Sequence, residues 1–309
     1  MESRSHKIAF VVATRDRPLD LRNMLQSLSD QSHRPDQVVI VDSSVESVEA
    51  TVADFSCLNI EYIHHHRPSA SAQRNIGLRY VDPDTDLIGF LDDDIVLEDG
   101  AMEKMLQFWQ RAPEDLGGCA FNLRNPPLRK ELPLKNSRLA EWLGVYSKNK
   151  GVVTPSGWHT LSGTVSETMF VEWLPSTASV WRKSVFGKFQ FDEYFDGYSY
   201  LEDLDFSYGV SKKYKLAVVA EAGFYHYPSE AGFYHYPSPS GRISQYDFGK
   251  IEVANRLYLV RKHGLSVPRC YLGLLLRLLV TLGASATRFD TGNLQRAVGN
   301  CVGLALSRL

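Results

Sequence analysis

Short apolar runs alternate with amphipathic segments over the first hundred residues, and this alternation limits the possible fold more than any other feature. Residues 8–13 (IAFVVA) and 38–41 (VVIV) have the uninterrupted, β-branched character of buried strands. Between them, leucines recur at helical spacing after Pro18, a residue that suits the first position of a helix. Strands that alternate with helices form a mainly parallel sheet covered by helices, so we predict an α/β fold.

Later segments extend the pattern and point to a candidate site. Ligands of such sheets bind beyond the carboxyl ends of the strands, and Asp42 and the run Asp92–Asp94 both follow strands. Residues 124–167 are rich in Pro, Gly, Asn and Ser, which predicts loops around a short helix near residues 139–143. Further strands are expected at residues 60–63, 87–91, 176–181 and 215–220, and helices at residues 71–80, 201–214 and 251–263.

Three consecutive aspartates, Asp92, Asp93 and Asp94, end the apolar run at residues 87–91. Adjacent carboxylates repel one another unless a cation or solvent relieves the charge. Their oxygens suit Mg²⁺ or Mn²⁺ that bridges phosphate oxygens. The alternative is a solvated turn in which an aspartate caps the next helix, but the position at the end of a buried strand favours a metal site.

Two other residues could contact a nucleotide. Asp42 follows the strand at residues 38–41, where a carboxylate can accept hydrogen bonds from a base or ribose; the alternative is a loop-capping role. Arg74 lies near the start of the helix at residues 71–80, where a guanidinium suits a pyrophosphate. The alternative for Arg74 is an ordinary surface arginine.

An acidic pair, Glu202 and Asp203, stands at the start of the helix expected at residues 201–214. Acidic residues favour that position in any case because of the helix dipole. The functional interpretation is a general base that removes the proton of an acceptor hydroxyl.

A tandem repeat supplies two candidate metal ligands. The sequence EAGFYHYPS occurs at residues 221–229 and again at residues 230–238, which gives His226 and His235. Nine identical residues are too short and too few for a solenoid, so we interpret them as a duplicated segment. Each histidine could pack among the aromatic residues, or could be a neutral nitrogen ligand to the metal of Asp94.

The C-terminal tail differs in charge from the rest of the chain. Residues 251–309 contain eight Lys and Arg and two Asp and Glu, whereas the whole chain has a net charge of −2, which argues against a nucleic-acid partner. The apolar run at residues 271–282 is interrupted by Arg277 and is shorter than the roughly 20 residues of a membrane span. We expect an interfacial helix that contacts the membrane surface, with a soluble helical extension or a dimer contact as alternatives.

The cellular compartment is predicted from the cysteines and from the N-terminus. The four cysteines are widely scattered and form no CxxC pair, which fits a reducing, intracellular environment. The polar first residues lead into an apolar run that is too short for a signal peptide. We therefore expect a cytoplasmic protein, either free or peripheral at the cytoplasmic face of the membrane.

Six short segments, in their order and spacing, together resemble glycosyltransferase family two, a large family of inverting enzymes with a GT-A fold. The resemblance runs from about residue 8 to residue 236, some three quarters of the chain. The segments are VATRDRP (12–18), VVIVDSS (38–44), AQRNIGL (72–78), FLDDD (90–94), FDEYF (191–195) and EDLD (202–205).

The resemblance implies roles for the matching positions. Asp203, paired with Glu202, would be the general base, and Asp92 to Asp94 would be the family's DXD motif. The metal, Mn or Mg, would be held by Asp92, Asp94 and one of His226 and His235. The nucleotide and its diphosphate would be bound by Thr14, Arg15, Asp16, Asp42, Arg74, Asp92 and Asp93.

We therefore expect a GT-A-like domain with a mixed, mainly parallel sheet at residues 1–240 and a basic, leucine-rich helical region at residues 241–309. The expected reaction moves a sugar, with inversion, from a nucleotide-sugar donor to a hydroxyl of a saccharide or lipid-linked acceptor, in polysaccharide or glycoconjugate synthesis. One alternative is a nucleotidyltransferase, although no Gly-rich loop with a Lys follows the first strand. Another is a non-catalytic sugar-nucleotide-binding protein, against which the Glu202–Asp203 pair argues.

Overall fold

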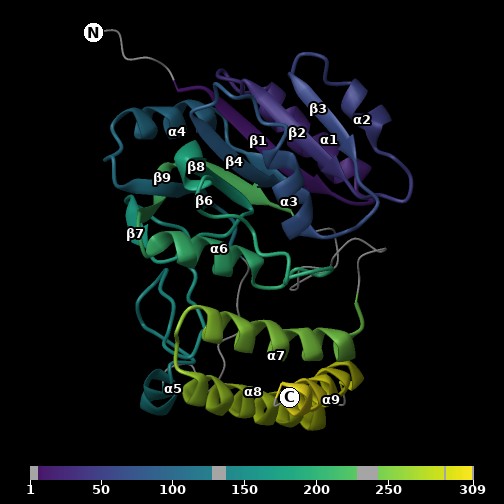
Figure 1. The fold of residues 1–309 in the computed structure, drawn as a ribbon, viewed down its shortest axis with the longest axis vertical. Helices are drawn as coiled ribbons and strands as arrows, with labels where there is room; N and C mark the ends of the chain where they lie inside the picture. The colour runs from purple at the N-terminus through teal and green to yellow at the C-terminus, as the bar shows by residue number, and fades with distance from the viewer. Residues whose placement is uncertain (1–5, 127–136, 228–242, 289, 308–309) are drawn as a thin grey trace. The chain divides into compact units, whose positions relative to one another are not determined.

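The chain divides into two compact units, each described here by itself. The computed structural model describes residues 6–126, 137–227, 243–288 and 290–307. Unit 1 is formed by Met1–Arg129 and Ser162–Gly241, and unit 2 by Lys130–Leu161 and Arg242–Leu309. Figure 1 shows the sheet of unit 1 and the helices of unit 2.

Unit 1 is built on a mixed, nine-stranded sheet with the order β3-β2-β1-β4-β8-β6-β9-β5, in which β7 also pairs with β9. Strands β1 to β4 run parallel to one another, and β8 runs antiparallel to β4 and β6. The strands are β1 (Ile8–Thr14), β2 (Gln37–Asp42), β3 (Ile60–His64), β4 (Leu87–Asp92), β5 (Ile95–Leu97), β6 (Leu116–Leu123), β7 (Met169–Val171), β8 (Ala178–Arg182) and β9 (Lys215–His226).

Helices cover both faces of this sheet. Residues of β1 alternate between two hydrophobic cores: Phe10 and Val12 join the core that contains α1 and α4, whereas Val11 joins the core that contains α6 and the partly buried residues of α3. Strands buried on both faces require continuous apolar runs, which explains the sequences of β1 and β2. The helices of unit 1 are α1 (Pro18–Ser29), α2 (Glu49–Ala53), α3 (Ala70–Leu78), α4 (Ala101–Gln110), the 3₁₀ helix η1 (Lys183–Val185) and α6 (Glu202–Ser211).

Helix α3 lies close to the parallel strands. A Cβ atom on Gly77 would come within 2.3 Å of Val11 Cγ1, so only glycine allows this approach. The Gln73 side chain donates hydrogen bonds to the backbone oxygens of Thr14 (3.1 Å) and Val41 (2.8 Å). These contacts hold α3 beside the carboxyl ends of β1 and β2, where the candidate site lies.

Unit 2 is helical and is held together by a buried ion cluster. Glu252 of α7 is 4% exposed and accepts two hydrogen bonds from the Arg296 guanidinium of α9, at 3.0 and 2.9 Å. Asn300 of α9 and Arg277 of α8 also approach this carboxylate, at 3.3 and 3.6 Å. The cluster therefore joins three helices. The helices of unit 2 are α5 (Arg138–Leu143), α7 (Gln245–Lys262), α8 (Val267–Arg288) and α9 (Thr291–Leu306).

The predicted α/β class and mainly parallel sheet are confirmed, but several elements differ from the prediction. The segment from β5 to β6 contains two strands and a helix where no element was predicted, because β5 has only three residues and pairs with the distant β9. Residues Lys130–Leu161 belong with the C-terminal helices rather than with the sheet. The functional boundary at residue 240 stays a prediction.

Helix α8 is longer than the predicted apolar run at residues 271–282. It extends from Val267 to Arg288, and the stretch Val267–Ser285 has a mean hydropathy of 1.4. Within the described residues, this one helix is long and apolar enough to cross a membrane by length and composition, although 28% of the stretch is buried inside the protein. Length alone therefore does not decide between a spanning and an interfacial helix.

Candidate functional site

The aspartate triplet lies at the carboxyl edge of the parallel strands, as predicted. In the sheet register, Ala13 of β1 is opposite Asp92 of β4, and Thr14 is opposite Asp42 of β2. Because β1 lies between its two partners, the ends of three strands meet at this edge. The Thr14 hydroxyl donates a hydrogen bond to Asp93 Oδ2 at 2.7 Å. The strand order thus brings together residues that are almost eighty positions apart.

Asp93 and Asp94 share one arginine nitrogen. Arg17 Nη1 lies 3.1 Å from Asp93 Oδ1 and 3.0 Å from Asp94 Oδ2. Asp93 and Asp94 are 5% and 7% exposed. Burial and the neighbouring Asp94 charge raise the pKa of Asp93 to about 7, although Arg17 and Thr14 oppose the shift. The single positive charge of Arg17 therefore does not balance the negative charge of Asp93 and Asp94.

His226 approaches Asp94 because of strand pairing. In the register of β5 and β9, Ile95 is opposite His226, and the Tyr227 backbone N–H donates to Asp94 O at 2.9 Å. His226 Nε2 lies 3.0 Å from Asp94 Oδ1. Burial lowers the pKa of His226, but the hydrogen bond and charge of Asp94 outweigh it and raise the pKa. His235, the alternative candidate, lies outside the described residues.

Arg74 links the triplet to the acidic pair on α6. Its guanidinium donates from Nη1 to Glu202 Oε1 at 2.9 Å and from Nη2 to Asp92 Oδ1 at 3.2 Å. The ring of Phe191 lies beneath it, 5.3 Å from the guanidinium carbon. Arg74 is 6% exposed, in the middle of α3 rather than at the solvent surface. It therefore holds the end of β4 and the start of α6 together.

The two carboxyl groups at the start of α6 belong to neighbouring residues, and both are partly buried. Burial and the Asp203 charge raise the pKa of Glu202, against the opposing effect of Arg74. Burial raises the pKa of Asp203 to about 6, although the Leu204 backbone N–H hydrogen bond and Arg74 oppose the shift. The preceding residue, Leu201, has a left-handed backbone with φ of 76°, which is costly for a leucine. The fold therefore accepts backbone strain at Leu201 in order to place Glu202 and Asp203 here.

Asp42 is saturated by its own loop. It is fully buried and accepts hydrogen bonds from the Ser44 backbone N–H and hydroxyl at 2.8 and 2.5 Å, and from the Val48 N–H at 3.0 Å. The Tyr62 hydroxyl adds a fourth at 2.6 Å, and burial and Asp42 raise the pKa of Tyr62 to about 12. These are the contacts of a loop-capping aspartate, one of the two interpretations of the sequence.

Asp16 and Arg15 belong to the loop after β1. The Asp16 backbone N–H donates to Ser44 Oγ at 2.7 Å, and Asp16 Oδ1 accepts from the Val45 N–H at 2.9 Å. Arg15 Nε lies 3.5 Å from Asp16 Oδ2. Asp16 has a φ of 53°, an uncommon conformation for a residue other than glycine. The loops after β1 and β2 are therefore tied to each other beside the triplet.

The donor set at the triplet fits a hard or borderline divalent cation, but its members have other partners. Asp94 and His226 converge, and carboxylate oxygen with imidazole nitrogen suits Mn²⁺ or Mg²⁺. Arg17 binds Asp93 and Asp94, whereas Arg74 draws Asp92 towards Glu202. Within the described part of the chain, no three His, Cys, Asp or Glu side chains are gathered around one point that could hold a metal.

Two residues of this region were absent from the predicted set. Arg17 precedes Pro18, the first residue of α1, and a basic residue at the start of a helix that follows a strand is a usable signal for an anion or carboxylate site. Tyr62 had no such signal, because its contact with Asp42 depends on the pairing of β2 with β3.

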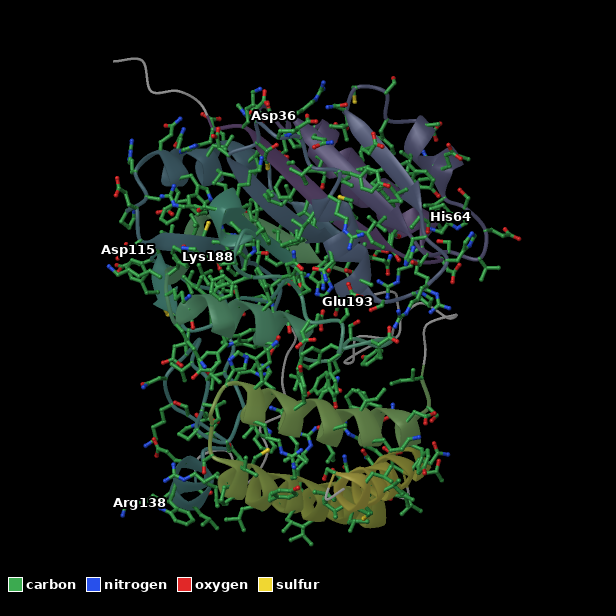
Figure 2. All side chains as sticks on the ribbon, viewed as in Figure 1. Asp36, His64, Asp115, Arg138, Lys188 and Glu193 are labelled. Atoms are coloured by element: carbon green, nitrogen blue, oxygen red, sulfur yellow. The ribbon has the colours of Figure 1, made fainter. Side chains whose placement is uncertain are left out.

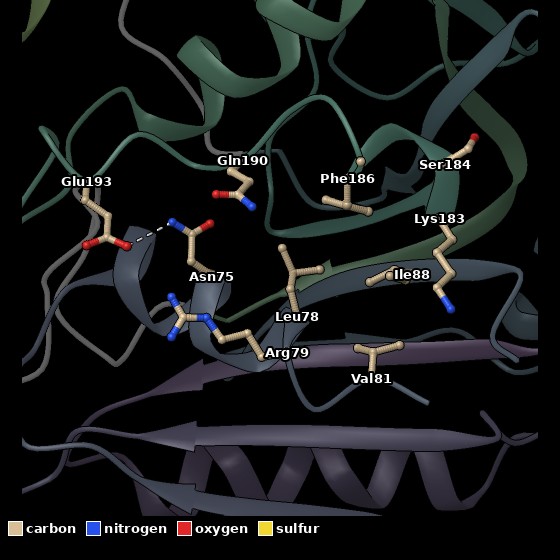
Figure 3. Close-up of a pocket in the computed structure, with 11 residues that line it drawn as sticks. Asn75, Leu78, Arg79, Val81, Ile88, Lys183, Ser184, Phe186, Gln190 and Glu193 are labelled. Atoms are coloured by element: carbon tan, nitrogen blue, oxygen red, sulfur yellow. Dashed lines mark hydrogen bonds between the residues drawn. The ribbon is translucent and has the colours of Figure 1, made fainter. Parts of the chain in front are cut away.

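A cleft of about 560 Å³ lies elsewhere in unit 1. It is lined by residues of α3, η1 and the following loop, among them Leu78, Arg79, Lys183 and Phe186. Figure 3 shows these residues and the hydrogen bond of 3.1 Å that Asn75 donates to Glu193 at one end. None of the predicted site residues lines this cleft. The functional site is therefore assigned to the carboxyl edge of the parallel strands, where the acids and arginines meet, and not to this cleft.

Sequence comparison decides the family. The profile of a family described as "Glycosyl transferase family 2" matches residues 9–166, half of the chain. The chain belongs to this family. The matched range includes most of β1, Arg74 and the aspartate triplet, whereas Glu202, Asp203 and His226 lie beyond it. No curated protein matches the chain by sequence.

Solved glycosyltransferase structures share the fold. The mannosyltransferase PcManGT from Pyrobaculum calidifontis, in complex with GDP-Man and Mn²⁺, has a TM-score of 0.55 at 11% identity, over 98% of this chain and 88% of that chain. S. aureus TarS 1-349 in complex with UDP-GlcNAc has a TM-score of 0.52 at 15% identity, over 94% and 90%. Another structure of S. aureus TarS 1-349 has a TM-score of 0.51 at 16% identity. The match covers 82% of this chain and 65% of the TarS chain.

Proposed function

We propose that this glycosyltransferase moves a sugar from a nucleotide-sugar donor to an acceptor hydroxyl with inversion, in polysaccharide or glycoconjugate synthesis. The observation that carries the proposal is the Arg74 bridge: one buried guanidinium joins Asp92 of the triplet to Glu202, beside Asp203. A diphosphate site and a general base must lie within one sugar of each other for a single displacement. The bridge supports that arrangement.

The donor would bind at the carboxyl edge of β1, β2 and β4. Thr14, Arg15, Asp16 and Asp42 shape the two loops there, with Asp42 acting through the loop that it caps. Two structures of similar fold hold UDP-GlcNAc and GDP-Man, so the proposal takes a nucleoside diphosphate sugar as the donor class. Arg74, Asp92 and Asp93 would face its diphosphate.

A divalent cation, Mn²⁺ or Mg²⁺, would be held by Asp92, Asp94 and a histidine, either His226 or His235. His226 is already 3.0 Å from Asp94, which favours it over the second copy. When bound, the cation would neutralise charge on the leaving diphosphate. The neighbour crystallised with GDP-Man also contains Mn²⁺, which supports the choice of metal.

Asp203 would act as the general base. Its carboxylate takes the proton of the acceptor hydroxyl while that oxygen attacks the anomeric carbon and the bond from that carbon to the diphosphate breaks. A base with a pKa of about 6 is ionised at neutral pH and is still basic enough to accept a proton. Glu202, bound to Arg74, would position the start of α6 and keep Asp203 in place.

The two alternative functions fit less well. Family membership argues against a nucleotidyltransferase. A non-catalytic binding protein has no need for two partly buried carboxyl groups whose pKa values are raised, because removing them from water costs stability. Raised pKa values in a buried cluster are typical of catalytic sites.

Thermal shift and donor hydrolysis test the proposal together. We expect one of UDP-, GDP- and dTDP-sugars to raise the melting temperature more with MnCl₂ than without it, and to be hydrolysed slowly. Asp115→Asn is the control and should give the same shift and hydrolysis as the unmodified protein. Asp115 lies on the surface (Figure 2), and its side chain forms an ion pair with exposed Lys215. Absence of any donor-dependent shift or hydrolysis would refute glycosyl transfer from these donors.

The acceptor side of the proposal rests on unit 2. Helix α8 exposes four leucines at intervals of three and four residues, whereas Cys270, Leu274 and Thr281 of the same helix are buried. Such a stripe on a half-buried helix is typical of an interfacial helix. We call it the leucine face; its members are Leu272, Leu275, Leu279 and Leu282.

Helix α5 adds an aromatic residue and positive charge to the leucine face. Trp142 is 61% exposed and lies 5.9 Å from the Arg269 guanidinium of α8. Arg138 projects from α5 into solvent (Figure 2), and Lys148 and Lys150 are also exposed. Tryptophan and basic residues together suit a membrane surface with anionic headgroups. We therefore propose that the acceptor is either a lipid-linked molecule or a saccharide in solution. Unit 2 would contact the cytoplasmic face of the membrane as a peripheral domain.

A further inference from the structure

Arg17 already binds Asp94, one of the carboxylates that the proposed cation would need. A single nitrogen, Nη1, lies 3.1 Å from Asp93 and 3.0 Å from Asp94. The Arg17 side chain is 17% exposed, and the side chains of both aspartates are buried. These are buried, charge-assisted contacts, which are stronger than ion pairs on the surface.

A divalent cation cannot simply be added to this arrangement. A guanidinium stays protonated at every pH at which the protein is folded, so Arg17 cannot give up its charge to make room. Two cations that share Asp94 would repel each other strongly in a buried site. The cation must therefore displace Arg17 from at least one of its two carboxylates.

The displaced side chain has a suitable place to go. Arg17 is the N-cap residue of α1, with Pro18 at the first helical position, so its neighbouring backbone N–H groups belong to a helix N-terminus. Helix N-termini attract phosphate groups. Asp20 in the first turn of α1 is the acidic residue that faces Arg17 from this side. A donor diphosphate bound at the triplet would offer Arg17 new negative charge as it leaves Asp93 and Asp94.

We propose that Arg17 exchanges partners during donor binding: it holds Asp93 and Asp94 in the free enzyme and moves to the donor diphosphate when the cation binds Asp94. This inference rests on the proposed function. It makes the cation and the nucleoside diphosphate bind cooperatively, since each removes an obstacle to the other. Arg17 is thus a binding residue for the donor and a competitor of the metal.

Mn²⁺ binding followed by electron paramagnetic resonance tests the exchange without any turnover. The variants are Arg17→Gln, Arg17→Lys and, as a control on the same helix, Arg22→Gln, whose partner is exposed Asp54. Each is titrated with Mn²⁺ alone and with saturating UDP or GDP. Circular dichroism checks the fold of each variant, and Arg17→Lys keeps the charge if Arg17→Gln does not fold.

We expect Arg17→Gln to bind Mn²⁺ alone about tenfold more tightly than the unmodified protein, as for a site freed from a competing state. The nucleotide should strengthen Mn²⁺ binding at least tenfold less in Arg17→Gln than in the unmodified protein, and Arg17→Lys should lie between them. Arg22→Gln should match the unmodified protein. Equal Mn²⁺ affinity and equal nucleotide coupling in Arg17→Gln would overturn the exchange while leaving the metal site intact. Failure of every variant to bind Mn²⁺, even with nucleotide, would overturn the metal site and the exchange with it.

Discussion

At the scale of single residues, the site balances the charges of five buried or partly buried acids against those of two arginines. Arg17 serves Asp93 and Asp94, and Arg74 serves Asp92 and Glu202. Within the described part of the chain, Asp203 forms no ion pair of its own, and burial has the largest effect on its pKa. Glu202 is paired with Arg74, whereas Asp203 has a raised pKa and no such partner among the described residues. This difference in environment suits Glu202 for positioning and Asp203 for accepting a proton.

Replacing the proposed base should abolish turnover and spare donor binding. In Asp203→Asn, we expect kcat to fall by about 10²–10⁴-fold, the usual contribution of a general base. The dissociation constant for the nucleotide should change by less than about threefold, because Asp203 acts on the proposed diphosphate residues Arg74 and Asp92 through its charge. Steady-state kinetics and calorimetry measure the two effects, and unchanged kcat would exclude Asp203 as the base.

The pH profile should carry the same signature. Asp203 must be ionised to act, and burial raises its pKa to about 6. As the pH falls below 6, the protonated fraction of the free enzyme grows, so kcat/KM should drop about tenfold per pH unit. This acid limb should disappear from the residual activity of Asp203→Asn. An acid limb that is identical in both proteins would assign the titration to another group.

At the scale of elements, the close packing of α7 on α9 depends on glycines. A Cβ atom on Gly299 would lie 2.0 Å from the Tyr246 backbone oxygen, and one on Gly249 would lie 2.3 Å from the Arg296 oxygen. Because backbone atoms cannot move aside as a flexible side chain can, these helices must separate to admit a methyl group. Separation would also stretch the hydrogen bonds between Glu252 and Arg296.

Gly299→Ala should therefore destabilise unit 2. Overpacking of this kind costs about 1–3 kcal/mol, and the loss of the buried pair would add to it. Gly283→Ala on α8 is the matched control, since its Cβ would meet nothing within 4 Å and alanine favours a helix. Thermal unfolding followed by circular dichroism should show a lower melting temperature for Gly299→Ala alone. Equal melting temperatures would mean that α7 and α9 are not packed as described.

At the scale of the whole molecule, the two units carry opposite charge. The segments of unit 2 contain fifteen Lys and Arg and five Asp and Glu, a net charge of +10, which leaves −12 for unit 1. Arg256 is buried and Arg296 is partly buried, but Arg138, Lys148 and Lys150 are exposed. An anionic bilayer would attract unit 2 and repel unit 1.

The full chain should bind anionic vesicles through the leucine face. We expect cosedimentation with vesicles of phosphatidylglycerol, weaker at high salt, and little binding to neutral phosphatidylcholine. Leu275→Ser with Leu279→Ser should reduce binding by more than about tenfold, because each buried leucine contributes roughly 1.5–3 kcal/mol. Leu19→Ser, at an exposed leucine of α1, is the control. If the double variant loses self-association instead, the face is a contact between two copies.

The sequence by itself determined the class of fold and predicted most residues of the candidate site. Continuous apolar runs such as residues 38–41 are tolerated only where both faces of a strand are buried, so the parallel half of the sheet was predictable. The helix between β1 and β2 was predictable from its leucine spacing and Pro18. The triplet and Arg74 were predictable for a similar reason: the triplet ends a recognisable strand, and Arg74 lies in a recognisable helix.

Only the tertiary structure decided which residues touch. Arg17 reaches Asp94 across 77 positions, Arg74 reaches Glu202 across 128, and His226 reaches Asp94 across 132. These pairs depend on strand order and register, to which a local sequence pattern has no access. The same applies to residues 130–161, whose place beside the C-terminal helices follows from long-range packing. Local periodicity specifies the elements, whereas burial of charge between distant elements specifies the site.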